Sequence, residues 1–362
     1  MTFKEFNLSQ NPFELIGRSL TSEVPVFWAG MKTQREQIEN IYINANKPRN
    51  LILNWGPFGT GKTHAAFYFK NQSIHVKQNV EFITLYVKTP LEGSNGIKQL
   101  LKDIIDDISF TKLKEIIKAR IAELGESKLF NLINSTIKSD VYASALIKLG
   151  DCEPKLTEFM YRYVYGNVTR TELKQFHLPR ALNTEVDYLK FLAGLIVCLT
   201  SGNNILTKVV LWIDELENLL YYTSKQFKRL TQGIITLVDT NENLLVFMNY
   251  TLNDDIDTLK ILIGDRLWSR INQKIEFTEL SMEKGLEYCH DLITHYQFEP
   301  STDYFPFEKD SLKVILNTLH TPYDINKTCS DILYYSLENQ VKKITKEKVV
   351  SFLNPSLNHS FR

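Results

Sequence analysis

Residues 56–63 have the types and the spacing of a loop that binds phosphate. They read Gly-Pro-Phe-Gly-Thr-Gly-Lys-Thr and match the pattern G-x-x-x-x-G-K-[ST] at every defined position. An apolar run at 51–53 precedes the loop, and a helix-forming run begins at His64. Glycines allow backbone N–H groups to turn toward a phosphate, and the start of the following helix adds partial positive charge there. A plain glycine turn would explain the glycines but not the Lys-Thr pair, so we predict nucleotide binding.

The lysine and the threonine of this loop have separate predicted roles. Lys62 would reach the β- and γ-phosphates of ATP, and the Thr63 hydroxyl would be a ligand of Mg²⁺. ATP and Mg²⁺ are therefore the predicted cofactors. The predicted nucleotide-binding residues are Gly56, Pro57, Phe58, Gly59, Thr60, Gly61, Lys62, Thr63 and His64.

Two acidic residues, Asp214 and Glu215, follow the apolar run at 209–213. Such a run is typical of a buried parallel strand, which would place the two acids at the carboxyl edge of a sheet, where ligands bind. We expect Asp214 to hold Mg²⁺ through water and Glu215 to polarise the attacking water as a general base. An acid pair alone is a weak signal. Together with the phosphate loop, it predicts an ATPase.

The elements that must position these residues follow from the apolar pattern. Core strands are predicted at 51–53, 80–87, 209–213, 244–249 and 274–277. From about 91 to 205, apolar residues recur at three- and four-residue spacing, with helical runs at 129–149, 156–165, 170–176 and 184–199. A crossover between parallel strands needs only about a dozen residues, so this block is predicted to be a helical insertion. The remaining helical runs are 226–238, 282–296, 309–318, 325–338 and 345–353.

These elements predict an α/β fold with a parallel sheet core of the P-loop type. The predicted regions are 1–48, an N-terminal segment beside the adenine; 49–278, the nucleotide-binding core; and 279–362, a helical lid. In the first region, Phe27 or Trp28 would offer an apolar face to the base. The alternative is that both aromatic side chains belong to the core.

Composition limits the classes of partner and compartment. The chain has 362 residues, 43% of them hydrophobic and 23% charged, with 42 basic and 42 acidic residues. Since the net charge is zero, nucleic-acid binding would need a local basic patch. The cysteines form no C-x-x-C pair, which argues against a zinc site and favours reduced thiols. No run is long enough to span a bilayer, and we expect a cytoplasmic protein without a membrane partner.

The order of these motifs resembles that of the AAA+ ATPases. The phosphate loop comes first, then the acid pair, a strand with a polar end, arginines before a last strand, and a helical lid. The lid sequence at 321–329 and the sequence at 343–349 look like the branch that contains origin-recognition initiators, transposition regulators of the Tn7 type and secretion-associated ATPases. The sequence at 214–217, with the long insertion before it, also resembles initiator-like accessory ATPases of phage-exclusion systems.

The resemblance implies two further roles, each with two candidate residues. Asn249, with Thr251 as second candidate, would position water near the γ-phosphate, although an asparagine that ends a strand is also common. Arg270, with Arg266 as alternative, would complete the nucleotide site of a neighbouring subunit and stabilise the transferring phosphoryl group. The alternative is that these arginines pair on the surface with Asp265 or Glu276.

The sequence departs from this branch at the lid. The arginine that the branch places after the lid proline is Tyr323 here, and Lys327, one helical turn further on, is a weak substitute. No winged-helix domain is expected after the last helix, so DNA contact would come from the core or the insertion.

The resemblance implies an ATPase that assembles with copies of itself on DNA or on a partner protein, in a mobile element or in defence against phage. Double-stranded DNA and an effector encoded nearby, such as a nuclease or a transposase, are the candidate partners. Two alternatives stay open: a nucleotide-locked interaction module with slow or no hydrolysis, and a signalling ATPase without a DNA role.

Overall fold

The computed structural model describes residues 2–14, 26–44, 50–71, 80–150, 153–202, 206–299, 301 and 303–353. The chain forms two compact units. The smaller unit consists of Met1–Glu39, Gly56–Gln72 and Glu276–Arg362, and the larger consists of Asn40–Trp55 and Ser73–Ile275. The three regions predicted from the sequence are continuous stretches of the chain, unlike these two units, and they stay a prediction.

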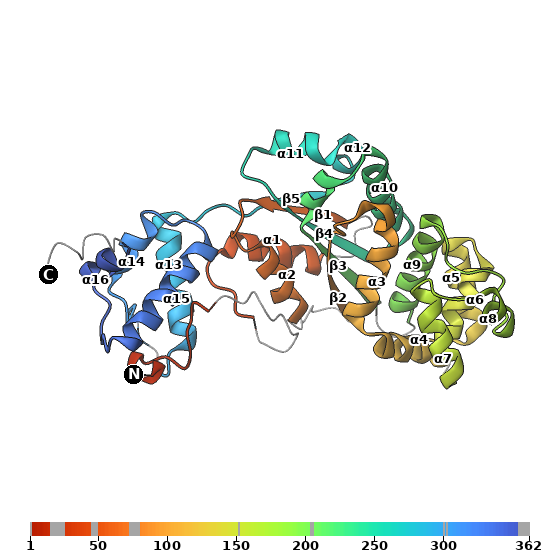
Figure 1. The fold of residues 1–362 in the computed structure, drawn as a ribbon, viewed down its shortest axis with the longest axis horizontal. Coiled ribbons are helices and arrows are strands. Elements are labelled where there is room, and N and C mark those ends of the chain that lie inside the picture. The colour runs from red at the N-terminus through yellow and green to blue at the C-terminus, as the bar shows by residue number, and fades with distance from the viewer. Residues whose placement is uncertain are drawn as a thin grey trace. The chain divides into compact units, whose positions relative to one another are not determined.

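The larger unit is built on a five-stranded sheet with the strand order β2-β3-β4-β1-β5 (Figure 1). Strand β2 pairs in parallel with β3, and β3 pairs in parallel with β4. Every residue of β3 after the first is buried, as expected of a strand covered on both faces. All five strands were predicted from the sequence, with shifts at their ends. Their bounds are β1 Asn50–Gly56, β2 Val80–Lys88, β3 Leu206–Asp214, β4 Leu244–Thr251 and β5 Gln273–Glu276.

A block of helices separates β2 from β3 along the chain, which confirms the predicted helical insertion. In Figure 1 this block runs from the orange helix α3 to the green helix α9. A short 3₁₀ turn, η2, precedes it. The bounds are η2 Gly93–Asn95, α3 Gly96–Ile108, α4 Phe110–Leu124, α5 Glu126–Ile137, α6 Asp140–Leu149, α7 Pro154–Val164, α8 Arg170–Gln175 and α9 Glu185–Thr200.

Single residues with positive φ break this block into short helices. Ser109 (φ 68°) separates α3 from α4, and Gly125 (φ 82°) separates α4 from α5. The predicted helical run at 129–149 contains a break, because Lys138 adopts a left-handed conformation (φ 50°) and ends α5. Apolar periodicity continues across these breaks, so it does not reveal them.

Helices that come before and after β3 in the chain pack on the sheet of the larger unit. Helix α3 packs on β2, α9 on β3 and α10 on β4, with apolar side chains from each forming one core. On the sheet, Trp212 stacks on Phe247 with 4.2 Å between ring centroids, and its indole N–H donates to the Tyr42 hydroxyl at 3.3 Å. Helix α11 was not predicted. The bounds are η3 Leu216–Tyr221, α10 Ser224–Thr240, α11 Ile256–Ile263 and α12 Asp265–Trp268.

The smaller unit contains the helical lid and the helix after the phosphate loop. Apolar side chains of the N-terminal segment, among them Phe6, Leu8 and Phe13, are buried in one core with the lid helices. Helix α1 begins in this unit and ends in the larger one. The bounds are η1 Phe3–Phe6, α1 Lys32–Ile43, α2 Lys62–Asn71, α13 Met282–Tyr296, α14 Lys309–Leu316, α15 Pro322–Glu338 and α16 Lys346–Leu353.

Cys198, Cys289 and Cys329 are buried free thiols, and Cys152 lies outside the described residues. In the part of the chain that the structure describes, no helix is long and apolar enough to cross a membrane.

Candidate functional site

The phosphate loop continues directly from β1, and its backbone requires glycine. Gly56, Gly59 and Gly61 have φ of 144°, 79° and 99°. A Cβ atom on Gly56 would lie 2.2 Å from the carbonyl oxygen of Phe277, and one on Gly59 would lie 2.7 Å from the Cβ of Tyr323. Close backbone approach and left-handed geometry therefore both exclude side chains at these two positions.

Lys62 is the first residue of α2 and lies at the base of the loop. It is only 6% exposed, and its ammonium donates to the carbonyl oxygens of Gly56 at 2.8 Å and Pro57 at 2.7 Å. A buried ammonium is costly unless it is hydrogen-bonded, so these carbonyl groups hold the cation inside the loop. The Thr60 hydroxyl also donates to the Pro57 oxygen, and Thr63 follows Lys62 as an exposed residue of α2.

His64 is held against the N-terminal segment. Its Nε2 lies 2.9 Å from the carbonyl oxygen of Phe27, which can only accept, so Nε2 is the protonated nitrogen. Burial lowers the pKa of His64, against the opposing effect of this hydrogen bond. Phe27 itself stacks on His295 with 3.8 Å between ring centroids. Trp28 is 6% exposed and packs edge-on against Tyr68 of α2, as a core residue does.

The start of lid helix α15 contacts the phosphate loop. The Tyr323 backbone N–H donates to the carbonyl oxygen of Gly59 at 3.1 Å, and its ring lies 5.3 Å from that of Phe58. Thr321 caps the helix by accepting from the Asp324 N–H, so α15 begins at Pro322 and not at the predicted 325. Lys327 is exposed. The residue that replaces the expected arginine thus joins lid and loop through its backbone and ring.

In the larger unit, Asp214 ends β3 in a buried setting. Asp214 is 4% exposed, and its Oδ2 accepts a hydrogen bond from the Tyr86 hydroxyl at 2.8 Å. Its Oδ1 accepts from the Glu215 N–H at 3.0 Å. Burial and the charge of Asp214 raise the pKa of Tyr86, so the phenol stays protonated and donates. These two contacts fix the orientation of the carboxylate.

Glu215 is adjacent to Asp214 and is partly exposed. Its backbone is left-handed (φ 55°), which is uncommon for a residue other than glycine and is found at functional sites. Its Oε1 lies 2.6 Å from the ammonium of Lys88 at the end of β2. The predicted general base is therefore in an ion pair with Lys88, a residue that no sequence pattern had indicated.

Asn249 lies in β4, two residues before that strand ends at Thr251, and β4 is next to β3. The paired stretch ends at Ile213 and Met248, so Asp214 and Asn249 occupy the next position on each strand. Asn249 is 1% exposed, and its Oδ1 accepts from the Nδ2 of Asn54 at 2.9 Å. Asn54 was not selected from the sequence. An asparagine inside the apolar run of β1 is a usable signal, because a polar side chain in a buried strand needs a hydrogen-bond partner.

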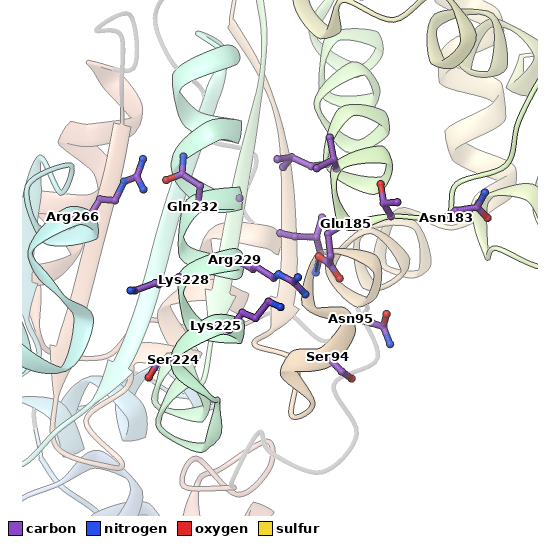
Figure 2. A pocket seen from close by; sticks show the side chains of 15 residues that line it. Ser94, Asn95, Asn183, Glu185, Ser224, Lys225, Lys228, Arg229, Gln232 and Arg266 are labelled. Atoms are coloured by element: carbon purple, nitrogen blue, oxygen red, sulfur yellow. Dashed lines mark hydrogen bonds between the residues drawn. The ribbon is translucent and has the colours of Figure 1, made fainter.

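The two predicted arginines lie in the larger unit on and after α12. Arg270 is exposed and pairs with Asp239 of α10 at 2.7 Å, whereas the sequence suggested Asp265 or Glu276 as partners. Arg266 is exposed and lines a cavity beside α10 (Figure 2). Their role toward a neighbouring subunit stays a prediction.

The oxygen donors of these residues suit a hard cation. Thr63 offers a hydroxyl and Asp214 a carboxylate, and Mg²⁺ prefers such oxygens together with phosphate and water. Among the described residues there is no group of three or more histidine, cysteine or acidic side chains that would hold a metal by itself.

Comparisons with known proteins place the fold. No family model matches the chain, and no curated protein matches it. The Aeropyrum pernix ORC2 protein, solved in ADPNP and ADP complexes, is similar to it with 12% identity, a TM-score of 0.54 and coverage of 94% of this chain and 70% of that chain. A chain of the Drosophila ORC bound to DNA is similar with 13% identity, a TM-score of 0.52 and coverage of 98% of this chain and 66% of that chain. At such low identity the likeness concerns the fold alone. The chain has the AAA+ fold, a P-loop parallel sheet with a helical insertion and a helical C-terminal part, as predicted.

Proposed function

We propose that this chain binds ATP with Mg²⁺ and hydrolyses it. The observation that supports this most directly is the phosphate loop, in which three glycines with positive φ surround a buried lysine at the start of a helix. Phosphate oxygens would compete with the loop carbonyls for the ammonium of Lys62. They would also accept from the backbone N–H groups of the loop and of the first turn of α2.

Each side chain has a defined part in this proposal. Thr63 and Asp214 would hold Mg²⁺, which would neutralise charge on the phosphates. Glu215 would accept a proton from the attacking water after its carboxylate leaves Lys88. Asn249, held by Asn54, would orient that water with its amide.

The test of the binding site is Lys62→Ala, with ATP affinity measured by calorimetry. We expect binding to be lost while far-ultraviolet circular dichroism is unchanged, because the ammonium serves the loop and not the apolar core. Lys70→Ala is the matched control, since it removes one positive charge from the same helix. Equal ATP affinity in the wild type and in Lys62→Ala would contradict the assignment. Glu215→Gln should still bind ATP but hydrolyse it more slowly, and wild-type turnover in that variant would exclude the general base.

We propose further that copies of the chain assemble, with Arg270 acting on the nucleotide of a neighbour. Its ion pair with Asp239 is partly exposed, with 41% and 32% of the side chains accessible, and such pairs contribute at most about 1 kcal/mol. An ion pair this weak can be exchanged for a phosphate. Asp239→Asn is therefore the control: it should retain turnover, whereas Arg270→Ala should bind ATP and hydrolyse it slowly.

Mixing experiments test the assembly itself. Arg270→Ala has an intact pocket but no arginine, and Lys62→Ala has an intact arginine but no pocket. In a mixture, one interface of each mixed pair is whole, so activity should reappear there and in neither protein alone. If the mixture is inactive and wild-type activity per subunit does not depend on concentration, Arg270 does not act on a neighbour. Arg266 would then be tested in the same way.

The partner proposed for the assembly is double-stranded DNA, and the support is the fold likeness to an ORC complex that was solved with DNA. ATP-dependent binding to a labelled duplex, measured by fluorescence anisotropy, tests this proposal. Binding that is absent with ATP, or equal in Lys62→Ala, would contradict it. A role in a mobile element or in defence against phage, with a nuclease or transposase as effector, stays a prediction from sequence resemblance.

One pair of observations favours the rival function, a nucleotide-locked interaction module. Tyr323 replaces the lid arginine and binds Gly59 through its backbone, and Lys88 holds the carboxylate of Glu215. Both features would slow hydrolysis without preventing nucleotide binding. Single-turnover measurements separate the two functions: tight ATP binding with no ADP formed over hours would favour the module.

A further inference from the structure

The short turn η3, Leu216–Tyr221, follows the acid pair and is held to the ends of both strands that flank β3. Strands β2, β3 and β4 are neighbours in the sheet (Figure 1). Pairing between β3 and β4 stops at Ile213 and Met248, whereas β4 continues to Thr251. The chain turns away from the sheet at Glu215, whose backbone is left-handed. Side chains of η3 then contact the strand ends in place of a strand partner.

Glu217, the second residue of η3, makes this contact with β4. Its Oε2 accepts from the Thr251 backbone N–H at 3.1 Å. A hydrogen bond to a carboxylate is charge-assisted and is therefore stronger than one between neutral groups. The bond joins the turn that follows Glu215 to the strand that carries Asn249, two residues before Thr251. The predicted general base and the predicted water-orienting amide are thus connected through Glu217.

The next residue of η3 makes the contact with β2. The Asn218 side-chain amide donates to the carbonyl oxygen of Thr89 at 3.2 Å, directly after β2 ends at Lys88. Thr89 in turn donates from its backbone N–H and from its hydroxyl to the carbonyl oxygen of Asp214, both at 2.8 Å. Two consecutive residues of η3 therefore reach β4 on one side and β2 on the other. Glu215 lies between Asp214 and this turn, so its backbone is held on both sides.

A buried phenol near Glu217 shows which donor the carboxylate accepts from. Tyr250 is 2% exposed, and its hydroxyl is buried with no hydrogen-bond partner among the described residues. Burial, and after it the charge of Glu217, raise the pKa of Tyr250 to about 12, so the phenol keeps its proton. Glu217 accepts from the Thr251 N–H and not from this hydroxyl. Removing the hydroxyl therefore changes the surroundings of Glu217 without removing its bond to β4.

From these contacts we propose that Glu217 is a positioning residue, which holds the general base Glu215 at a fixed distance from the amide of Asn249. The inference rests on the proposed function, because it concerns the same site. In this role Glu217 acts through the backbone and not on the substrate: its bond to Thr251 keeps η3 close to the end of β4. Both groups that act on the attacking water then keep one arrangement. A misplacement of about 1 Å can lower a rate by about a hundredfold.

The experiment compares Glu217→Ala, which removes the acceptor, with Glu217→Gln, which keeps an amide oxygen in its place. Hydrogen exchange of the Thr251 amide, resolved by mass spectrometry with electron-transfer fragmentation, measures the bond without any need for ATP. In Glu217→Ala this amide should exchange at least about tenfold faster than in the wild type, and in Glu217→Gln within about threefold of it. The kcat for ATP should fall at least about tenfold in Glu217→Ala, while the dissociation constant of ATP changes less than about threefold. Glu217→Gln should retain most of the wild-type kcat.

Two further variants serve as controls. Tyr250→Phe removes the unbonded hydroxyl and should leave both Thr251 exchange and kcat within about twofold of the wild type. Glu217→Asp keeps the charge but is shorter by one methylene, so it should behave like Glu217→Ala, and it replaces that variant if the alanine protein does not fold.

Three results would overturn the proposal while leaving the proposed ATPase intact. They are unchanged Thr251 exchange in Glu217→Ala, a loss of kcat in Glu217→Gln as large as in Glu217→Ala, and a loss of that size in Tyr250→Phe. A purely structural role would instead lower ATP affinity and kcat together, which also overturns it. A wild type that binds ATP but shows no turnover would overturn the positioning role together with the proposed hydrolysis, and the exchange of Thr251 would then still show whether the bond exists.

Discussion

Replacing Lys88 should increase ATP turnover, because its ion pair must break before the Glu215 carboxylate can accept a proton from the attacking water. The Lys88 ammonium lies 2.6 Å from Glu215 Oε1, and the two side chains are 61% and 40% exposed. Exposed pairs of this kind contribute about 0.2–1 kcal/mol. Releasing the carboxylate costs that amount in the wild type and nothing in Lys88→Met. Since 1.4 kcal/mol is a tenfold change, kcat should rise by a factor of about 1.4 to 5.

The assay is steady-state phosphate release at saturating ATP, with Lys88→Arg as the control that keeps the ion pair. Salt provides a second measurement, because the Debye length shortens from about 8 Å at 0.15 M to about 3 Å at 1 M. Wild-type turnover should therefore approach that of Lys88→Met as salt rises. The free energies of unfolding of the two proteins should differ by less than about 1 kcal/mol. A fall in kcat of tenfold or more in Lys88→Met would refute the reasoning and place the lysine in the chemistry.

Three further predictions concern stability. Gly59→Ala should destabilise the chain by more than about 2 kcal/mol, because it adds a collision with Tyr323 to the cost of a positive φ. Gly125→Ala is the control without the collision, since Gly125 has φ 82° and no atom within 4 Å of an added Cβ. Equal losses of stability in urea unfolding would contradict this prediction. Asn249→Leu should lower the free energy of unfolding by about 1–3 kcal/mol, because it leaves the Asn54 amide buried without its partner. Adding Asn54→Leu should recover part of that loss. No recovery would mean that the two asparagines do not act as a unit. Because burial lowers the pKa of His64, its contribution to stability is complete above the unfolded pKa of about 6.5 and is lost as pH falls below it. The melting temperature of the wild type should therefore fall more between pH 7 and pH 5 than that of His64→Gln. Parallel profiles of melting temperature against pH would exclude this effect.

The sequence alone determined the parts of this protein that depend on neighbouring residues. The phosphate loop lies within eight consecutive residues, so its pattern could be recognised without any knowledge of the fold. The five strands were predicted because buried parallel strands have continuous apolar runs. The acid pair was placed at a strand end for the same reason. The insertion followed from its length, since a simple crossover between β2 and β3 needs far fewer residues.

The tertiary structure decided the contacts that join distant parts of the chain. Lys88 meets Glu215 because β2 pairs with β3, and Asn54 meets Asn249 because β1 lies beside β4. One sequence gives the period of each strand but not the order of strands in the sheet. Partner residues 127 and 195 positions apart therefore could not be selected in advance.

The same holds for the lid and for the surface. Tyr323 reads in the sequence as a missing arginine, whereas in the fold its backbone N–H binds Gly59. Arg270 pairs with Asp239, which is 31 positions away on α10, and not with the nearby acids that the sequence suggested. Local chemistry is determined by consecutive residues, but the partners of each side chain are determined by how the elements pack.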